Sequence, residues 1–209
     1  MKLKHKVVAV AIATMFAGVA FGQGSVSKVN VDAINQSQSG LLNKQEMDLG
    51  NAKGGGKSNV TAKQITQSQS GLLNQQKMAI GNATGKGSES KVNVTNVSQS
   101  QSGLLNKQEM GIGNASGGGK SNVTAKDIRQ SQSGLLNQQK MAIGNADSKG
   151  VSKVNVGNIT QSQSGLLNKQ EMGIGNAANS GKSDVTAKNI TQSQSGLLNQ
   201  QKMNVGNAN

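Results

Sequence analysis

The string Gln-Ser-Gln-Ser-Gly-Leu-Leu-Asn occupies residues 36–43 and returns five times along a chain of 209 residues. The later copies begin at Gln67, Gln99, Gln130, Gln161 and Gln192. The copies are spaced by 31 or 32 residues. A fixed period in this range is typical of solenoids and other repeat arrays, so the repeat takes priority over any local motif.

Side chains around each copy alternate between two kinds. From Ile34 to Leu49, apart from the turn at 40–42, aliphatic and carboxamide residues alternate with serine and charged residues. A period of two predicts β-strands. The phase slips between Ala33 and Ile34, which predicts a bulge or corner. The alternative, a helix over residues 41–49, has only about two turns, which are not stable alone.

Each copy is therefore predicted to form a strand, a tight turn, a second strand and a Gly/Lys turn. Stacked copies make an all-β, six-rung β-solenoid that rises ~4.8 Å per rung and continues into a cross-β fibre. The predicted repeats are residues 29–52, 60–83, 92–115, 123–146, 154–177 and 185–208. Glycines expected at the tight turns are Gly40, Gly71, Gly103, Gly134, Gly165 and Gly196. The leucine pair in each turn is expected to pack between copies, and its alternative role is a lateral contact between filaments.

Carboxamides are expected to stack inside the solenoid. Asn and Gln make up 47 of the 209 residues, and each side-chain amide both donates and accepts, so identical residues in successive copies can form ladders. The predicted interior ladders are Gln38, Asn43, Gln45, Gln69, Asn74, Gln76, Gln101, Asn106, Gln108, Gln132, Asn137, Gln139, Gln163, Asn168, Gln170, Gln194, Asn199 and Gln201.

One equivalent position alternates in charge from copy to copy. It reads Glu46, Lys77, Glu109, Lys140, Glu171 and Lys202. If the copies stack in register, each neighbour in this charge column is an opposite charge, and like charges on adjacent strands are avoided. Duplication of a two-copy unit explains the period but not the opposite signs.

The composition excludes several classes of protein. Only 1% of the residues are aromatic, there is no Cys, Trp, Tyr or Pro, and the one histidine is His5. A compact apolar core built on large rings is therefore not expected, nor are a disulfide scaffold or Cys and His chemistry. We expect no enzymatic activity, no catalytic or metal site, no cofactor and no small-molecule substrate.

The N-terminal segment is predicted to be a secretory signal peptide, residues 1–22. Lys2, Lys4 and Lys6 precede an apolar run over residues 7–20, and small residues flank a cleavage position after Gly22. The alternative is an uncleaved anchor, for which the run is short. Cleavage lowers the formal net charge from +13 to +10 and leaves residues 23–209 as one domain without aromatic residues.

The repeat resembles the curlin repeat of bacterial curli. Gln38-x-Gly40-x-x-Asn43 matches the centre of that repeat, and the other five copies keep the same three residues, although the period here is longer. The resemblance implies an extracellular functional amyloid subunit of a biofilm matrix, made by a Gram-negative bacterium.

The copies at the two ends of the chain are expected to present open β edges, with Glu46 at one end and Lys202 at the other. Head-to-tail stacking would continue the charge column and build a filament. We therefore expect a secreted homopolymer that acts in adhesion, with a nucleator subunit and secretion factors as possible partners. The basic charge suggests non-specific binding to extracellular DNA or anionic polysaccharide. The alternatives are a monomeric surface-binding solenoid, either an adhesin or an ice-binding protein, and a disordered matrix protein.

Overall fold

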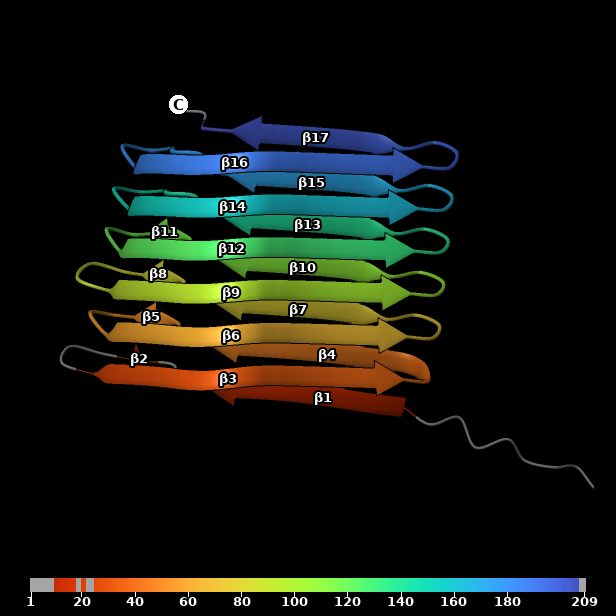
Figure 1. The fold of residues 1–209 in the computed structure, drawn as a ribbon, viewed down its shortest axis with the longest axis horizontal. Helices are drawn as coiled ribbons and strands as arrows, with labels where there is room; N and C mark the ends of the chain where they lie inside the picture. The colour runs from red at the N-terminus through yellow and green to blue at the C-terminus, as the bar shows by residue number, and fades with distance from the viewer. Residues whose placement is uncertain (1–9, 18–19, 22–24, 207–209) are drawn as a thin grey trace, which may run out of the picture.

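The computed structural model describes residues 10–17, 20–21 and 25–206, and every regular element in these residues is a β-strand. The strands stack into a β-solenoid of six rungs (Figure 1). The predicted all-β solenoid is confirmed. The helical alternative over residues 41–49 is wrong, because Leu41–Leu49 is a strand.

Each rung begins with a strand of 14 residues and returns along a shorter one. The long strands are β3 (Val26–Ser39), β6 (Lys57–Ser70), β9 (Glu89–Ser102), β12 (Lys120–Ser133), β14 (Val151–Ser164) and β16 (Lys182–Ser195). The return strands are β4 (Leu41–Leu49), β7 (Gln75–Ile80), β10 (Lys107–Ile112), β13 (Gln138–Ile143), β15 (Lys169–Ile174) and β17 (Gln200–Val205). We number the rungs one to six in chain order, so that β3 and β4 open rung one and β16 and β17 form rung six.

A third, very short strand follows the return strand in the first three rungs. These strands are β5 (Ala52–Lys53), β8 (Ala83–Thr84) and β11 (Ala115–Ser116). The ladder continues as single bridges from Ala115 to Ala146 and from Ala146 to Ala177. Two residues are too few to show a period, so the sequence pattern predicted only a turn here.

All strand pairs are parallel, and the pairs between the long strands and between the return strands of successive rungs are in register. The long strands form a six-stranded sheet in the order β16-β14-β12-β9-β6-β3, and the return strands lie in a second sheet that ends with β15-β17. Equivalent repeat residues pair directly, as Gln36 does with Gln67 and Met47 with Met78. The inner face of each sheet is covered by the opposite sheet, whereas the outer face is exposed.

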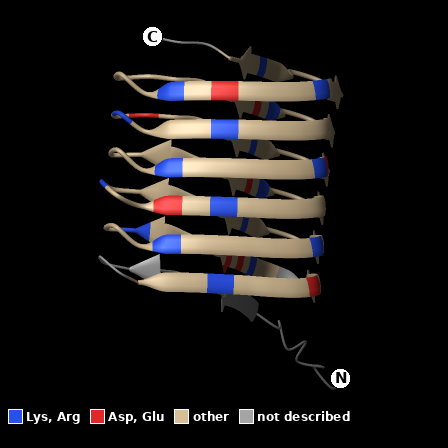
Figure 2. Ribbon diagram, turned by 60° about the vertical axis from the view of Figure 1, so that its left-hand side comes forward, with Lys and Arg blue, Asp and Glu red and all other residues tan. Residues whose placement is uncertain are grey.

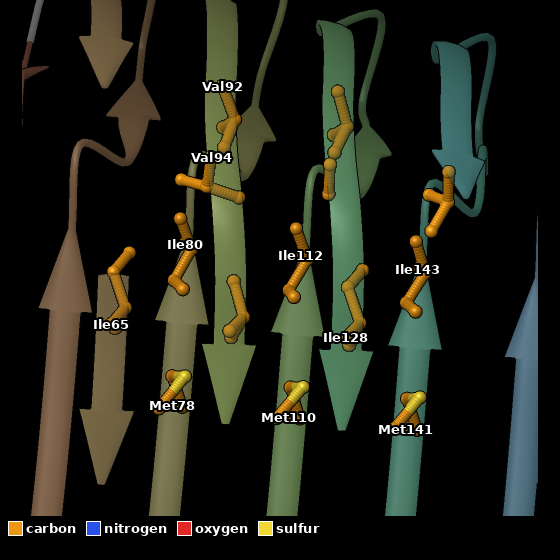
Figure 3. Packing of buried hydrophobic residues seen from close by; sticks show 14 of the residues in the cluster. Ile65, Met78, Ile80, Val92, Val94, Met110, Ile112, Ile128, Met141 and Ile143 are labelled. Carbon is orange, nitrogen blue, oxygen red and sulfur yellow. The ribbon is translucent and has the colours of Figure 1, made fainter. Parts of the chain in front are cut away.

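The apolar core is one continuous stack between the two sheets (Figure 3). Met78, Met110 and Met141 lie above one another, as do Ile80, Ile112 and Ile143, and valines and isoleucines of the long strands face them. The core is therefore elongated along the solenoid axis rather than compact. Methionine and aliphatic side chains fill it, because each methionine packs on a methionine and each aliphatic side chain on an aliphatic one in the next rung.

The phase slip predicted near Ala33 is present in β3. Asp32 and Ala33 are both exposed, whereas Ile34 is buried. The ladder skips Asp32, passing from the Val31–Ala62 pair to the Ala33–Gln64 pair. The long strand thus bends at this point, which keeps both of its halves facing the core.

Two further strands lie on rung one and belong to the predicted signal peptide. β1 (Val10–Ala17) pairs in parallel with β4, and β2 (Ala20–Phe21) pairs with β5. The rest of that prediction, including cleavage after Gly22, lies outside the described residues. No helix among the described residues is long and apolar enough to cross a membrane.

Replacing a tight-turn glycine should disrupt the stack. Gly103 has a φ of 119°, and a Cβ at this residue would overlap the backbone carbonyl of Gly71 in the rung below. We expect Gly103→Ala to lower the free energy of unfolding by about 2 kcal/mol or more, measured by thermal circular dichroism.

Gly111→Ala is the matched control for this substitution. Gly111 lacks a positive φ, and its column already holds Ala79 and Ala142 on either side. Equal stability of the two variants would contradict the role assigned to the turn glycines.

Candidate functional site

The most regular polar feature of the interior is a ladder of glutamine amides from the return strands. The Nε2 of Gln76 donates to the Oε1 of Gln45 at 2.8 Å, and Gln108, Gln139 and Gln170 repeat the bond at 2.8 Å. Gln201 closes the series with a bond of 3.0 Å to Gln170, but it is exposed on rung six rather than inside as predicted. All the bonds run in one direction, because each rung donates to the rung below it.

A second ladder runs through the long strands and was missing from the predicted site residues. It comprises Gln36, Gln67, Gln99, Gln130, Gln161 and Gln192, joined by Nε2–Oε1 bonds of 2.9–3.0 Å. Each amide also donates to a backbone carbonyl of its own return strand, as Gln67 does to Lys77 at 3.2 Å. The alternation around Ile34 places this column on the inner face and would have identified it.

The other two predicted columns are buried in rungs two to five, only partly buried at Gln38, Gln194 and Asn199, and bond differently. Asn74 and its equivalents donate to the carbonyl of their own turn glycine, Gly71 for Asn74 at 2.7 Å. Gln101, in the Gln38 column, donates to the backbone carbonyl of Asn74 at 2.9 Å. These side chains therefore fix the tight turn and join it to the next rung, whereas amide-to-amide contacts in the Gln38 column reach only 3.5 Å.

An asparagine column at the opposite turn was also not predicted. The Oδ1 of Asn51 accepts from the backbone N–H of Asn82 at 2.8 Å, and Asn82, Asn114 and Asn145 each accept in the same way from the rung above. The recurring Gly-Asn-Ala triplet is the signal that could have indicated it, because asparagine is common where the backbone turns.

The glutamine ladder of the return strands has an unsatisfied donor at rung one. Gln45 is fully buried, and its Nε2 has no partner among the described residues. Ala13 of β1 occupies the register position below it. A buried amide N–H without a partner costs about 1–3 kcal/mol, so this edge favours another glutamine.

The six residues of the charge column lie in register on the return strands. Between neighbouring rungs of this column, Lys77 and Glu46 form an ion pair, in which the Nζ of Lys77 lies 3.4 Å from the Oε1 of Glu46. Glu109 and Glu171 instead bind Lys107 and Lys169 of their own strands, both at 2.9 Å. The hydrogen bond from Lys169 lowers the pKa of Glu171, although partial burial opposes that shift.

At one position of the long strands, lysine is present in rungs one, three and five and absent from rungs two and four (Figure 2). Lys28, Lys91 and Lys153 are separated in their column by Asn59 and Asn122. The same spacing lets a strongly basic chain stack in register without placing two lysines on adjacent strands at these positions.

Two unbroken serine columns run along the outer face of the long strands. They begin at Ser37 and Ser39, and in the first four rungs they line a shallow groove with the glutamines of the Gln38 column. The register aligns each serine with serine through all six rungs. The surface is therefore a regular array of hydroxyl groups.

The turn leucines form an apolar ridge along one edge of the solenoid. From Leu42 to Leu167 their described side chains are 37–47% exposed. The ridge is made of Leu42, Leu72, Leu73, Leu104, Leu105, Leu135, Leu136, Leu166, Leu167, Leu197 and Leu198. These leucines are exposed, so a continuous apolar strip faces solvent along this edge.

Comparison of the chain with models of protein families, with characterised proteins and with solved structures finds no match. The resemblance to the curlin repeat therefore stays a prediction. Among the described residues, no three His, Cys, Asp or Glu side chains are grouped so that they could hold a metal ion.

The ladder can be tested with two neighbouring glutamines of β13. Gln139→Leu removes two buried bonds of 2.8 Å and leaves a donor on Gln170 and an acceptor on Gln108 unpaired. We expect the free energy of unfolding to fall by about 2 kcal/mol or more in chemical denaturation.

Gln138→Leu changes the adjacent, outward-facing residue of the same strand. It should leave the stability nearly unchanged, within about 0.5 kcal/mol. A similar loss in both variants would show that the ladder has no special role.

Proposed function

We propose that the chain is a secreted structural subunit that assembles head-to-tail into an amyloid-like extracellular fibre. The observation that carries this proposal is the directional glutamine ladder. At one end the Nε2 donor of Gln45 has no partner and is covered by β1, and at the other end Gln201 donates downward to Gln170. A second copy placed above rung six would supply the donor for the Oε1 of Gln201, and it would in turn satisfy its own Gln45.

The backbone supports the same contact. β3 and β16 are the outer strands of the long-strand sheet, and β17 is an outer strand of the return-strand sheet. Outer strands present rows of N–H and C=O groups that pair with another chain. Repetition of the internal parallel register across such a contact is heterologous and does not close, so it builds a filament.

The direction of the ladder favours head-to-tail over head-to-head contacts. Two rung-one ends would bring Gln45 donors together, and two rung-six ends would bring Gln201 acceptors together. Only the opposite ends are complementary, so the fibre is polar.

β1 lies on the edge that this contact requires, beside β4. Its removal with the predicted signal peptide would expose the β4 edge, whereas the β3 edge is already the outer strand of its sheet. Export and assembly competence are coupled in this proposal, because the segment that directs secretion also covers half of rung one.

A biofilm matrix is the setting that the curlin-like motif favours, with adhesion as the role of the fibre. A nucleator subunit, secretion factors and binding to extracellular DNA or anionic polysaccharide belong to this proposal as predicted partners. The bond-forming parts of the molecule are backbone edges and amide ladders, which suit a structural role without enzymatic activity.

The second candidate function is a monomeric surface-binding solenoid, either an adhesin or an ice-binding protein. The two serine columns favour it, because they present hydroxyls at a fixed spacing on a flat sheet. A chain that stays monomeric at high concentration would support this candidate.

The test of the fibre uses protein produced from the complete coding sequence in a bacterium, with its N-terminus determined by mass spectrometry. We expect amyloid-dye fluorescence to rise after a lag that preformed seeds abolish, and electron microscopy to show unbranched fibres. A strand-rich protein that stays monomeric under these conditions would contradict the proposal.

Retention of the leader should slow assembly. A chain that keeps residues 1–22 has β1 over β4, so we expect seeded elongation to be slower by about tenfold or more than for the processed chain. Equal elongation rates would show that β1 does not protect this edge.

A further inference from the structure

We propose that the subunit junction is specified by residues that only rungs one and six carry, so that rung six docks on rung one of the next copy in a single register. This inference rests on the proposed fibre. The four interior rungs show which residue each column tolerates, and the end rungs depart from that pattern in a complementary way.

The first departure is in the column that contains Asp32. Along the solenoid this column reads Asp32, Lys63, Thr95, Lys126, Gly157 and Lys188. Odd rungs after the first carry a neutral residue, and only rung one carries an acid. Within one chain the Nζ of Lys63 lies 2.9 Å from the Oδ1 of Asp32. In the fibre, Lys188 of the preceding copy would approach Asp32 from the other side.

The second departure is in the column that contains Lys28. It reads Lys28, Asn59, Lys91, Asn122, Lys153 and Asp184. The other even rungs carry asparagine, and only rung six carries an acid. The next residue in this column across a junction is Lys28, so Asp184 would lie between two lysines.

The third departure is in a column of small residues on the return strands. It reads Asp48, Ala79, Gly111, Ala142, Gly173 and Asn204. Both polar members are in the end rungs, where a junction brings the amide of Asn204 beside the carboxylate of Asp48. Interior rungs keep this column to Ala or Gly.

The remaining charged columns are compatible with the same register. Lys202 would face Glu46, and Gln200 would face Lys44, which continues the alternation inside the chain. A slip by two residues along the strand separates Lys188 from Asp32 and Asn204 from Asp48. One register therefore satisfies all these columns together.

Exposed ion pairs contribute little to affinity, so backbone bonds and the glutamine ladder hold the junction. Charge complementarity acts on the encounter rate and on the choice of partner and register. We call this set of end-rung residues the junction code. It favours a second copy of this chain as the partner and disfavours a copy docked in a shifted register.

The test uses two substitutions in one column. Lys188→Glu places like charges at the junction, whereas its neighbour inside the chain is the neutral Gly157. Lys126→Glu makes the same charge change between the neutral Thr95 and Gly157, but in the interior of the solenoid. Both lysines are exposed, so each variant should keep the circular dichroism spectrum of the unaltered chain.

Seeded elongation and the residual soluble concentration are measured for both variants at low and high salt. We expect Lys188→Glu to elongate about fivefold more slowly at low salt and to approach the unaltered chain near 1 M salt, since screening weakens exposed charges. Lys126→Glu should elongate at nearly the rate of the unaltered chain. Adding Asp32→Thr to Lys188→Glu should recover most of the lost rate, because the like-charge contact is gone.

Equal behaviour of Lys188→Glu and Lys126→Glu would overturn the junction code and leave the fibre itself standing. Failure of the double variant to recover would also overturn it. Absence of fibres from the unaltered chain would instead overturn the proposed function and the junction with it.

Discussion

Parallel, in-register stacking is the constraint on which the rest of this structure depends. A buried side chain meets the equivalent side chain of the rungs above and below, so each column must be compatible with itself. Glutamine satisfies this condition because its amide donates to one neighbour and accepts from the other, as Gln76 does between Gln45 and Gln108. Methionine and isoleucine satisfy it by packing. The interior can therefore hold polar columns beside apolar ones.

Charge is the exception, because a charged residue is not compatible with a copy of itself at the ~4.8 Å separation of adjacent strands. The chain resolves this by repeating every two rungs rather than every one. Glu46 is followed by Lys77, and Lys28 by Asn59. The alternation serves register more than stability, because only Lys77 and Glu46 form an ion pair within the charge column.

The sequence predicts the solenoid well, because a period of two inside a period of 31 or 32 residues leaves few other folds. It predicts which side chains face inward but not how each amide bonds. Asn43 and Gln45 share one face, yet Asn43 donates to its own turn at Gly40 while Gln45 enters the ladder. That difference comes from the backbone geometry of the turn. The apolar run over residues 7–20 was interpreted only as a targeting segment, although Met15 of β1 lies in register with Met47 of β4 and Ala20 of β2 with Ala52 of β5.

The leucine ridge gives the solenoid one apolar edge. Within a single chain the strip is only about 29 Å long, six rungs at ~4.8 Å, which is small for a stable protein interface. In a polymer the strips of successive copies join into one line. The attraction between two such rods grows in proportion to their length, whereas the loss of translational and rotational freedom on association occurs once. In the proposed fibre, bundling would therefore depend on length, because long rods would attract one another along a line that separate subunits lack.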